Sequence, residues 1–146
     1  MEDSIRDELA IRELVARYAA TVGNGDVEGW SRTWAEDGEW EVLGQTSRGR
    51  EAVTNRLEEL LGGLEFVVQM ASGGILEIRG DQATGYWQIT EHGRFAGGNP
   101  LFTLGAYRDR YVRVEGDWRF ARRGFHAIYV GPPDMSAKAT PPPVDF

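Results

Sequence analysis

The sequence contains no cysteine, so the chain has neither disulfides nor thiolate ligands for a metal ion. Its two histidines, His92 and His126, do not have the spacing of a metal site. The apolar runs are too short to cross a bilayer, and residues 1–4 are acidic where a signal peptide is basic. With 23 acidic and 16 basic residues, the net charge of −7 opposes binding to phosphate backbones. We therefore expect a cytoplasmic protein with no metal, no cofactor, and no nucleic-acid or membrane partner.

The clearest feature that is present is a long β-hairpin within residues 101–129. Two runs rich in aromatic and β-branched residues flank Glu115-Gly116-Asp117, and a glycine between acidic residues is typical of a hairpin turn. Each run is longer than the usual strand of about five or six residues, so the ribbon must bend. Gly105 and Gly124 are the positions at which a bend costs least. A strongly bent antiparallel ribbon is expected to enclose a cavity on its concave side.

The rest of the chain divides into helices followed by strands. Within residues 4–22, apolar side chains recur at helical spacing, at Ile11, Leu14, Val15, Tyr18 and Val22. The predicted helices are residues 4–22 with Ser4 as N-cap, a shorter helix capped by Asp26 that runs through Trp34 to near Gly38, and residues 50–64. The predicted strands are residues 39–43, 65–78 and 82–95 and the two runs of the hairpin, with a loop at residues 44–49. This order predicts an α+β fold with helices on one face of an antiparallel sheet.

The length fits one domain with one hydrophobic core. We expect this single domain to comprise residues 1–131. Residues 132–146 contain five of the six prolines and show no periodicity, so they are predicted to form an extended C-terminal tail.

Six short segments then occur in a characteristic order. They are Tyr18, Gly25-Asp26, WAEDGEW at 34–40, GREA at 49–52, GAYRD at 105–109 and WRFARR at 118–123. This ordered set resembles the SnoaL-like domain of the nuclear transport factor 2-like, cystatin-like superfamily, nearest the scytalone dehydratase and dehydrochlorinase branch. The resemblance implies a cone in which three N-terminal helices lie on the concave face of a strongly bent antiparallel sheet. It also implies an internal pocket and a homodimer or homotrimer.

The resemblance does not settle the activity, because the superfamily includes cyclases, dehydratases, isomerases, non-catalytic relatives and small subunits of ring-hydroxylating dioxygenases. In the dehydratase and dehydrochlorinase relatives an Asp orients a His that removes a proton; here Gly23 and Gln69 occupy those positions. A neutral amide cannot accept a proton at neutral pH. The isomerase-like relatives use a Tyr and an Asp, which correspond to Tyr18 and Val42. Neither family site is complete in this chain.

Alternation along the strands selects other side chains that should face the pocket. The predicted catalytic residues are Glu91 as acid or base, with Tyr18, Tyr107 and Arg123 as donors to a developing enolate. The predicted ligand-binding residues are Trp40, Val42, Gln69, Trp87, Asp109 and Phe125. The same alternation assigns a second apolar set to the outer face of the last strand, where a partner subunit would cover it. That set is Trp118, Phe120, His126 and Ile128.

Several alternatives remain open from the sequence. Tyr18 could be a core residue, Gln69 a buried amide satisfied by the backbone, and Glu91 and Arg123 a structural ion pair. The chain is expected to bind a small apolar, aromatic or polycyclic molecule, as a cyclase, dehydratase or isomerase. It could instead be a ligand-binding relative without activity, or a scaffolding subunit whose pocket is filled by its own side chains.

Overall fold

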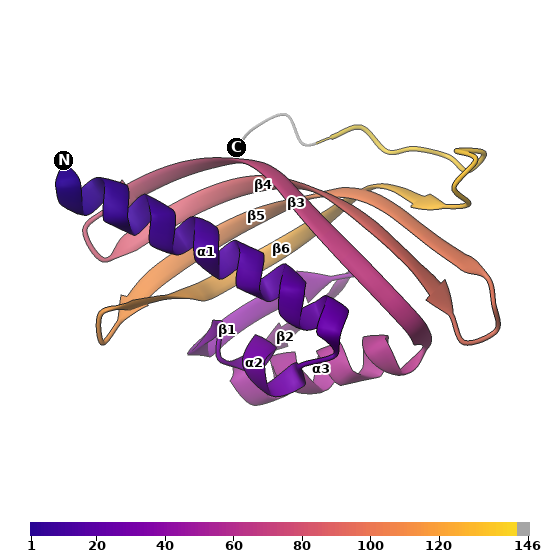
Figure 1. The fold of residues 1–146 in the computed structure, drawn as a ribbon, viewed down its shortest axis with the longest axis horizontal. Coiled ribbons are helices and arrows are strands. Elements are labelled where there is room, and N and C mark those ends of the chain that lie inside the picture. Colours follow the sequence, from indigo (N-terminus) through magenta and orange to yellow (C-terminus); the bar gives the residue numbers. More distant parts are fainter. Residues whose placement is uncertain (143–146) are drawn as a thin grey trace.

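The computed structural model describes residues 1–142 and shows a bent six-stranded sheet with three helices (Figure 1). The helices are α1 (Glu2–Asn24), α2 (Val27–Ser31) and α3 (Arg50–Gly62). The strands are β1 (Trp34–Val42), β2 (Gln45–Arg48), β3 (Leu64–Arg79), β4 (Gln82–Phe95), β5 (Pro100–Val114) and β6 (Asp117–Gly131). Their order in the sheet is β2-β1-β6-β5-β4-β3. The predicted α+β class with a bent sheet and N-terminal helices is confirmed, with one addition: β1 pairs parallel to β6, and the other neighbours are antiparallel.

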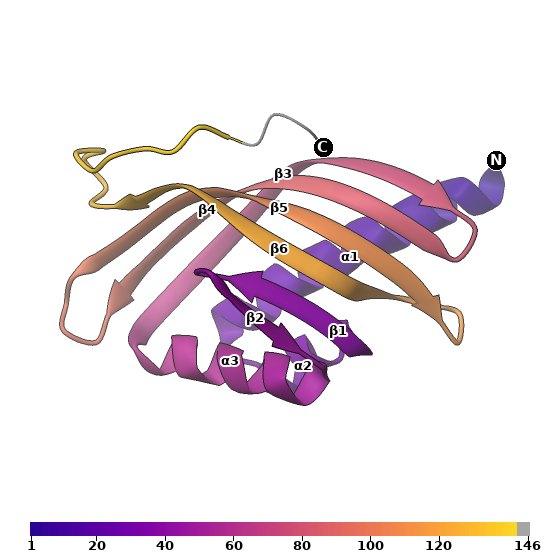
Figure 2. The same ribbon diagram turned by 180° about the vertical axis from the view of Figure 1, so that it is seen from behind.

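The four long strands β3 to β6 arch over the helices. Helix α1 crosses one face of these strands, and Figure 2 shows the same strands from behind, in front of α1. Helices α2 and α3 and the short strands β1 and β2 lie together at one side of the arch. None of the helices in residues 1–142 is long and apolar enough to cross a membrane.

Helix α1 presents the predicted apolar stripe to the interior, since Ile11, Leu14, Val15, Tyr18 and Val22 are all buried. The helix ends at Gly25, whose φ of 67° is the left-handed conformation that glycine adopts at a C-cap. It begins earlier than predicted, at Glu2, with Met1 at the N-cap position. Ser4 lies inside the helix, where its hydroxyl donates to the Met1 carbonyl. Asp26 caps α2 as predicted, accepting from the Gly29 backbone N–H at 2.9 Å.

Two elements near β1 differ from the sequence prediction. The second helix ends at Ser31, and Trp34 begins a strand because it pairs with Phe120 on β6. Residues 45–48 form β2 instead of a loop, paired antiparallel with β1. Leu43 and Gly44 both have positive φ, 53° and 75°, which is the backbone twist of a two-residue hairpin turn. Pairing with distant strands therefore overrides local helical spacing at Trp34.

The predicted hairpin tip is confirmed. Val114 pairs with Asp117, and the two residues between them, Glu115 and Gly116, have φ of 51° and 86°. Of the two predicted bend positions, Gly105 lies at a register shift between β5 and β6, and a Cβ there would lie 2.3 Å from the Phe125 ring. Gly124 pairs regularly with Arg108, so it marks no irregularity in that ladder.

A β-bulge on β6 corrects the predicted outer face. Tyr111 pairs with Phe120 but Arg110 pairs with Arg122, so Ala121 is the extra residue and reverses the alternation on its N-terminal side. Phe120 is therefore inside: it is 0% exposed and packs on Tyr18, Trp34 and Tyr111. Trp118 is also buried in the core, and its indole N–H donates to Asp7 on α1 at 3.1 Å.

The other two residues assigned to the outer face lie under the chain's own tail. The His126 Nε2 is 3.0 Å from the Pro141 carbonyl oxygen, and the Thr140 N–H donates to the Ile128 carbonyl at 2.7 Å. The chain after β6 runs back along the sheet (Figures 1 and 2), and residues 143–146 of the predicted tail lie outside the described part of the chain. The outer surface of β6 is thus partly covered by the chain itself.

Candidate functional site

A partly enclosed cavity of about 220 Å³ lies between α1, α3, β1 and the concave face of the sheet. Most of its wall is aliphatic, with Val42 and Leu43 from the end of β1 and Leu57, Leu60 and Leu61 from α3. A larger hollow of about 590 Å³ lies between α1 and β3, but it is an open groove. We take the partly enclosed cavity as the candidate site because it contains the convergent polar side chains.

The polar end of the cavity is a hydrogen-bonded cluster contributed by β3, β4, β5 and α1. The Gln69 amide nitrogen donates to a Glu91 carboxylate oxygen at 2.6 Å and lies 3.4 Å from the Tyr107 hydroxyl. The Thr103 hydroxyl also hydrogen-bonds to Glu91, and the hydroxyls of Tyr18 and Tyr107 hydrogen-bond to each other. All five side chains line the same cavity.

Glu91 is the acidic side chain in this wall, and its environment alters its acidity. Burial disfavours the charged carboxylate and raises the pKa of Glu91 above its usual value, while the hydrogen bonds from Gln69 and Thr103 oppose that rise. Burial likewise raises the pKa of the Tyr18 and Tyr107 phenols, so both stay protonated near neutral pH and can donate hydrogen bonds. The arrangement combines a proton acceptor of raised pKa with two phenolic donors.

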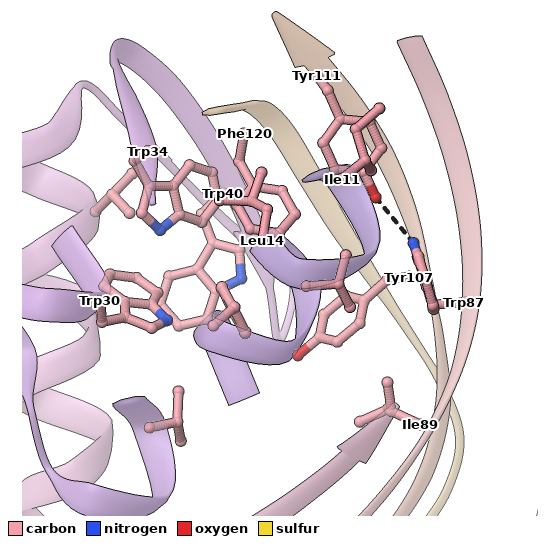
Figure 3. Close-up of a cluster of buried hydrophobic side chains, with 14 of the residues drawn as sticks. Ile11, Leu14, Trp30, Trp34, Trp40, Trp87, Ile89, Tyr107, Tyr111 and Phe120 are labelled. Carbon is pink, nitrogen blue, oxygen red and sulfur yellow. Dashed lines mark hydrogen bonds between the residues drawn. The ribbon is translucent and has the colours of Figure 1, made fainter. Parts of the chain in front are cut away.

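A second buried network lies beside the cavity. The Arg123 Nε donates to Asp109 at 2.9 Å, with both side chains almost fully buried. The Tyr111 hydroxyl donates to the other Asp109 oxygen at 2.6 Å, and the Trp87 indole N–H donates to Tyr111 at 2.8 Å (Figure 3). Asp109 pairs directly with Arg123 across β5 and β6, whereas Glu91 lies on β4, one strand further away. Arg123 therefore pairs with Asp109 and not with Glu91, which corrects the ion pair considered from the sequence.

The Arg123 guanidinium stacks on the aromatic side chains that separate it from the cavity. Its central carbon lies 3.6 Å from the Tyr107 ring centre, 4.3 Å from that of Tyr18 and 4.6 Å from that of Phe120. These are cation–π distances. Arg123 is close to the site through these rings but is not among the side chains that line the cavity.

Three tryptophans, Trp30, Trp34 and Trp40, pack against one another in the core (Figure 3). Trp40 also lines the cavity wall. Its buried indole N–H has no hydrogen-bond partner within residues 1–142.

The structure brings together seven of the ten predicted site residues: Tyr18, Trp40, Val42, Gln69, Glu91, Tyr107 and Phe125 all line the cavity. The other three, Trp87, Asp109 and Arg123, belong to the adjacent network, and Trp87 faces the open groove. Strand alternation predicted that Thr103 faces the pocket but gave it no role at the site, and the α3 leucines were not assigned to the site. Thr103 has the same strand parity as Tyr107, and the leucines share the apolar stripe of α3, so both signals were present in the pattern.

The positions of the family dyad are also clear in the structure. Gly23, near the end of α1, lines the open groove together with Gln69, which reaches both the groove and the cavity. Neither histidine lines the cavity: His92 packs on Phe102, and His126 contacts the tail. In residues 1–142, no group of three or more His, Asp or Glu side chains is arranged to hold a metal ion.

The fold is shared with several solved structures. Rv3472 from Mycobacterium tuberculosis, a protein of unknown function, is 29% identical, with 86% of this chain and 74% of that chain covered and a TM-score of 0.79. A hexachlorocyclohexane dehydrochlorinase, LinA type 2, is 20% identical over 98% of both chains, with a TM-score of 0.85. A scytalone dehydratase-like protein from Novosphingobium aromaticivorans is 20% identical over 100% of this chain and 99% of that chain, with a TM-score of 0.86.

At 20% identity the last two likenesses show the fold alone. No curated protein sequence matches the chain. The family model of the SnoaL-like domain, however, matches residues 3–124, which include every side chain of the polar cluster. The chain therefore belongs to the SnoaL-like domain family.

Proposed function

We propose that this protein is an acid–base enzyme of the lyase or isomerase type that acts on a small, mainly apolar molecule. The observation that carries the proposal is the Glu91 carboxylate, which lies partly buried in a mainly aliphatic cavity beside two phenol hydroxyls. A carboxylate of raised pKa is a better base near neutral pH, and phenols are suitable donors to an oxygen that gains negative charge.

In the proposed reaction, Glu91 takes a proton from the carbon next to a carbonyl group of the ligand. The electron pair of the broken C–H bond moves toward the carbonyl oxygen, which accepts hydrogen bonds from Tyr107 and Tyr18. Where the ligand carries a β,γ C=C bond, the enolate is conjugated, and return of the proton from Glu91 to the γ carbon completes an isomerisation. Departure of a group from the β carbon with its electron pair completes an elimination.

The size of the cavity restricts the ligand. A volume of about 220 Å³ is smaller than the roughly 300–1,000 Å³ typical of sites for drug-sized ligands. It is larger than the roughly 150 Å³ of an engineered cavity that binds benzene. A substituted single ring fits these limits better than the polycyclic substrate considered from the sequence.

A second candidate function is ligand binding without catalysis. Both Gln69 and Thr103 hydrogen-bond to Glu91, and hydrogen bonds to the charged form make a carboxylate a weaker base, which favours a role in orienting a bound molecule. A scaffolding subunit is less well supported, because a cavity filled by its own side chains was expected for that role and this cavity retains free volume.

Exchange of carbon-bound protons separates these functions without knowledge of the natural substrate. The protein is incubated in D₂O with single-ring cyclic ketones, and loss of the α-proton signals is followed by NMR beside a melting-temperature assay for binding. An enzyme should raise the exchange rate, and Glu91→Gln should abolish this rise while changing ligand affinity by less than about tenfold. Glu41→Gln, on the outer pair with Arg122, is the matched control.

The outcomes are distinct. A ligand that raises the melting temperature without faster exchange supports the binding protein. If ketones neither bind nor exchange, the acid–base proposal is wrong for this class of ligand. Exchange that survives Glu91→Gln would remove Glu91 from the role of base.

A further inference from the structure

The position of Arg123 raises a question that its ion pair with Asp109 does not answer. The side chain is 1% exposed and does not line the cavity, so it cannot contact a ligand there. A buried ion pair is often no more stabilising than apolar side chains of the same volume. One terminal nitrogen of Arg123 also has no hydrogen-bond partner within residues 1–142. These features point to a role for the positive charge of Arg123 beyond stabilising the fold.

The guanidinium lies against the faces of the two rings whose hydroxyls line the cavity. Its central carbon is 3.6 Å from the ring centre of Tyr107 and 4.3 Å from that of Tyr18. The Tyr107 hydroxyl points away from the Tyr111–Trp87 hydrogen bond that supports the ion pair (Figure 3). The Arg123 guanidinium thus contacts the face of the Tyr107 ring, whereas the hydroxyl lies at the edge of the same ring.

We propose that Arg123 is a positioning residue that acts through Tyr107 and Tyr18, strengthening their hydroxyls as hydrogen-bond donors to an oxyanion in the cavity. This inference rests on the proposed acid–base function. When a phenol donates to an oxyanion, negative charge accumulates on the phenol, and a cation over the ring face stabilises that charge. The effect is strong because the surroundings are apolar and exclude water.

Asp109 does not cancel this effect at the rings. Its carboxylate contacts the Arg123 Nε and the Tyr111 hydroxyl, so the cation is the charge in contact with Tyr107 and Tyr18. In agreement, burial raises the pKa of the Tyr107 phenol, and the Arg123 charge opposes that rise. The network of Asp109, Tyr111 and Trp87 then has the role of holding the guanidinium against the rings.

The test uses 4-nitrophenol, a single-ring probe whose absorbance reports its ionisation. The parent protein carries Glu91→Gln, which removes carboxylate repulsion and mimics the base after it has taken a proton. The apparent pKa of the bound probe is measured for this parent and after further substitution. Replacing the ion pair with neutral groups, Arg123→Met with Asp109→Asn, should raise the bound pKa by about one unit, a factor of ten.

Asp109→Asn alone supplies a second, independent result of opposite sign. It leaves the cation unneutralised, so the bound probe should ionise at lower pH than in the parent. Arg122→Met is the matched control, because Arg122 is the next residue on β6 and pairs with Glu41 on the outer side. It should leave the bound pKa unchanged. A purely structural role for Arg123 would alter affinity or folding without these shifts.

The possible results test the role of Arg123 and the proposed acid–base function separately. Unchanged bound pKa values in both Asp109→Asn and the neutral double variant would overturn the role of Arg123 while leaving the proposed acid–base function intact. A parent protein that does not bind 4-nitrophenol at any pH would show that the cavity does not accept an oxyanion mimic. That outcome would overturn the proposed function and this inference together.

Discussion

Gln69 donates to the Glu91 carboxylate at 2.6 Å, and the two residues are direct partners across β3 and β4. The resemblance implies that dehydratase and dehydrochlorinase relatives carry a catalytic His at the position of Gln69. In this chain that position holds a neutral amide, and the titratable group lies opposite it on the neighbouring strand. If the protein is an enzyme, its base therefore lies one strand away from the position of the His in these relatives, at the same end of the cavity.

The first prediction concerns the pH dependence of stability. Because the native pKa of Glu91 lies above its usual value of 4.5, the folded protein binds this proton more tightly than the unfolded chain. The contribution of Glu91 to the free energy of unfolding is thus greatest below pH 4.5 and decreases as pH rises through the native pKa. Glu91→Gln should become more stable relative to the wild type over this window. Urea denaturation from pH 4 to 8 would contradict the prediction if the difference stayed constant.

The second prediction concerns the buried ion pair. Asp109→Asn leaves the Arg123 charge buried without a counter-ion and should reduce the free energy of unfolding by about 3–5 kcal/mol. Neutralising both partners, as Asp109→Asn with Arg123→Met, should cost less than the single change. Glu41→Gln breaks a partly exposed pair with Arg122 and should cost no more than about 1 kcal/mol. Chemical denaturation of the three variants gives the order, and a double variant less stable than Asp109→Asn would refute this account.

The third prediction tests the correspondence with the family dyad. The Cβ of an Asp at Gly23 would lie 3.4 Å from the Val67 carbonyl oxygen, a contact that small shifts can relieve. Gly23→Asp combined with Gln69→His should therefore fold, and the new carboxylate should raise the pKa of the introduced imidazole above that in Gln69→His alone. NMR titration of both variants measures this difference. Equal imidazole pKa values would show that the two positions do not face each other.

The fourth prediction concerns the cavity. Val42 lines it and is nearly buried, so Val42→Phe should fill part of the volume, abolish ligand-induced stabilisation and change the free energy of unfolding by less than about 3 kcal/mol. The same substitution at Val114, which is exposed and outside the cavity, is the control. Thermal melts of both variants with and without ligand measure this stabilisation. Undiminished binding by Val42→Phe would place the ligand elsewhere.

The fifth prediction concerns assembly through the outer face of the sheet. With Phe120 inside, a group of exposed apolar side chains remains on β3, the edge strand of the sheet, where Phe66, Val68 and Met70 are 46%, 49% and 53% exposed. If two or three copies associate there, Val68→Lys with Met70→Lys should yield monomers by light scattering. Ile5→Lys, at an exposed site on α1, should leave the oligomer unchanged. A wild-type protein that is monomeric at micromolar concentration would end the proposal.

The fold could be predicted because its main signals are local. The apolar spacing of α1 and the turn residues Glu115 and Gly116 each specify an element within a short window. Trp34 could not be assigned to a strand in this way, because its partner Phe120 lies more than 80 residues later in the chain. Phe120 itself was misplaced because a single bulged residue, Ala121, reverses the alternation on which the assignment depended.

The candidate site was predictable to the extent that strand parity and family position agreed, as for Tyr107 and Gln69. Parity gave the correct face for Arg123 but not its partner. Counting back from the hairpin tip without a bulge would pair Asp109 with Arg122, and the extra residue Ala121 shifts the register so that Asp109 pairs with Arg123. Arg123 lies behind Tyr18 and Tyr107 and does not line the cavity. That placement depends on side-chain packing in three dimensions, which the alternation of residues along a strand cannot predict.

The parallel pairing of β1 with β6 has a consequence for the order of folding. Trp34 and Trp40 can pair with Phe120 and Arg123 only after the chain has closed a loop of more than 80 residues. The β5–β6 hairpin, by contrast, needs a turn of only two residues. Contacts between distant residues form slowly because closing a long loop costs chain entropy. In refolding experiments we therefore expect the hairpins to gain protection from hydrogen exchange before the tryptophan fluorescence reaches its native value. The ligand cavity, whose wall includes Trp40, would then be sealed in the last kinetic phase.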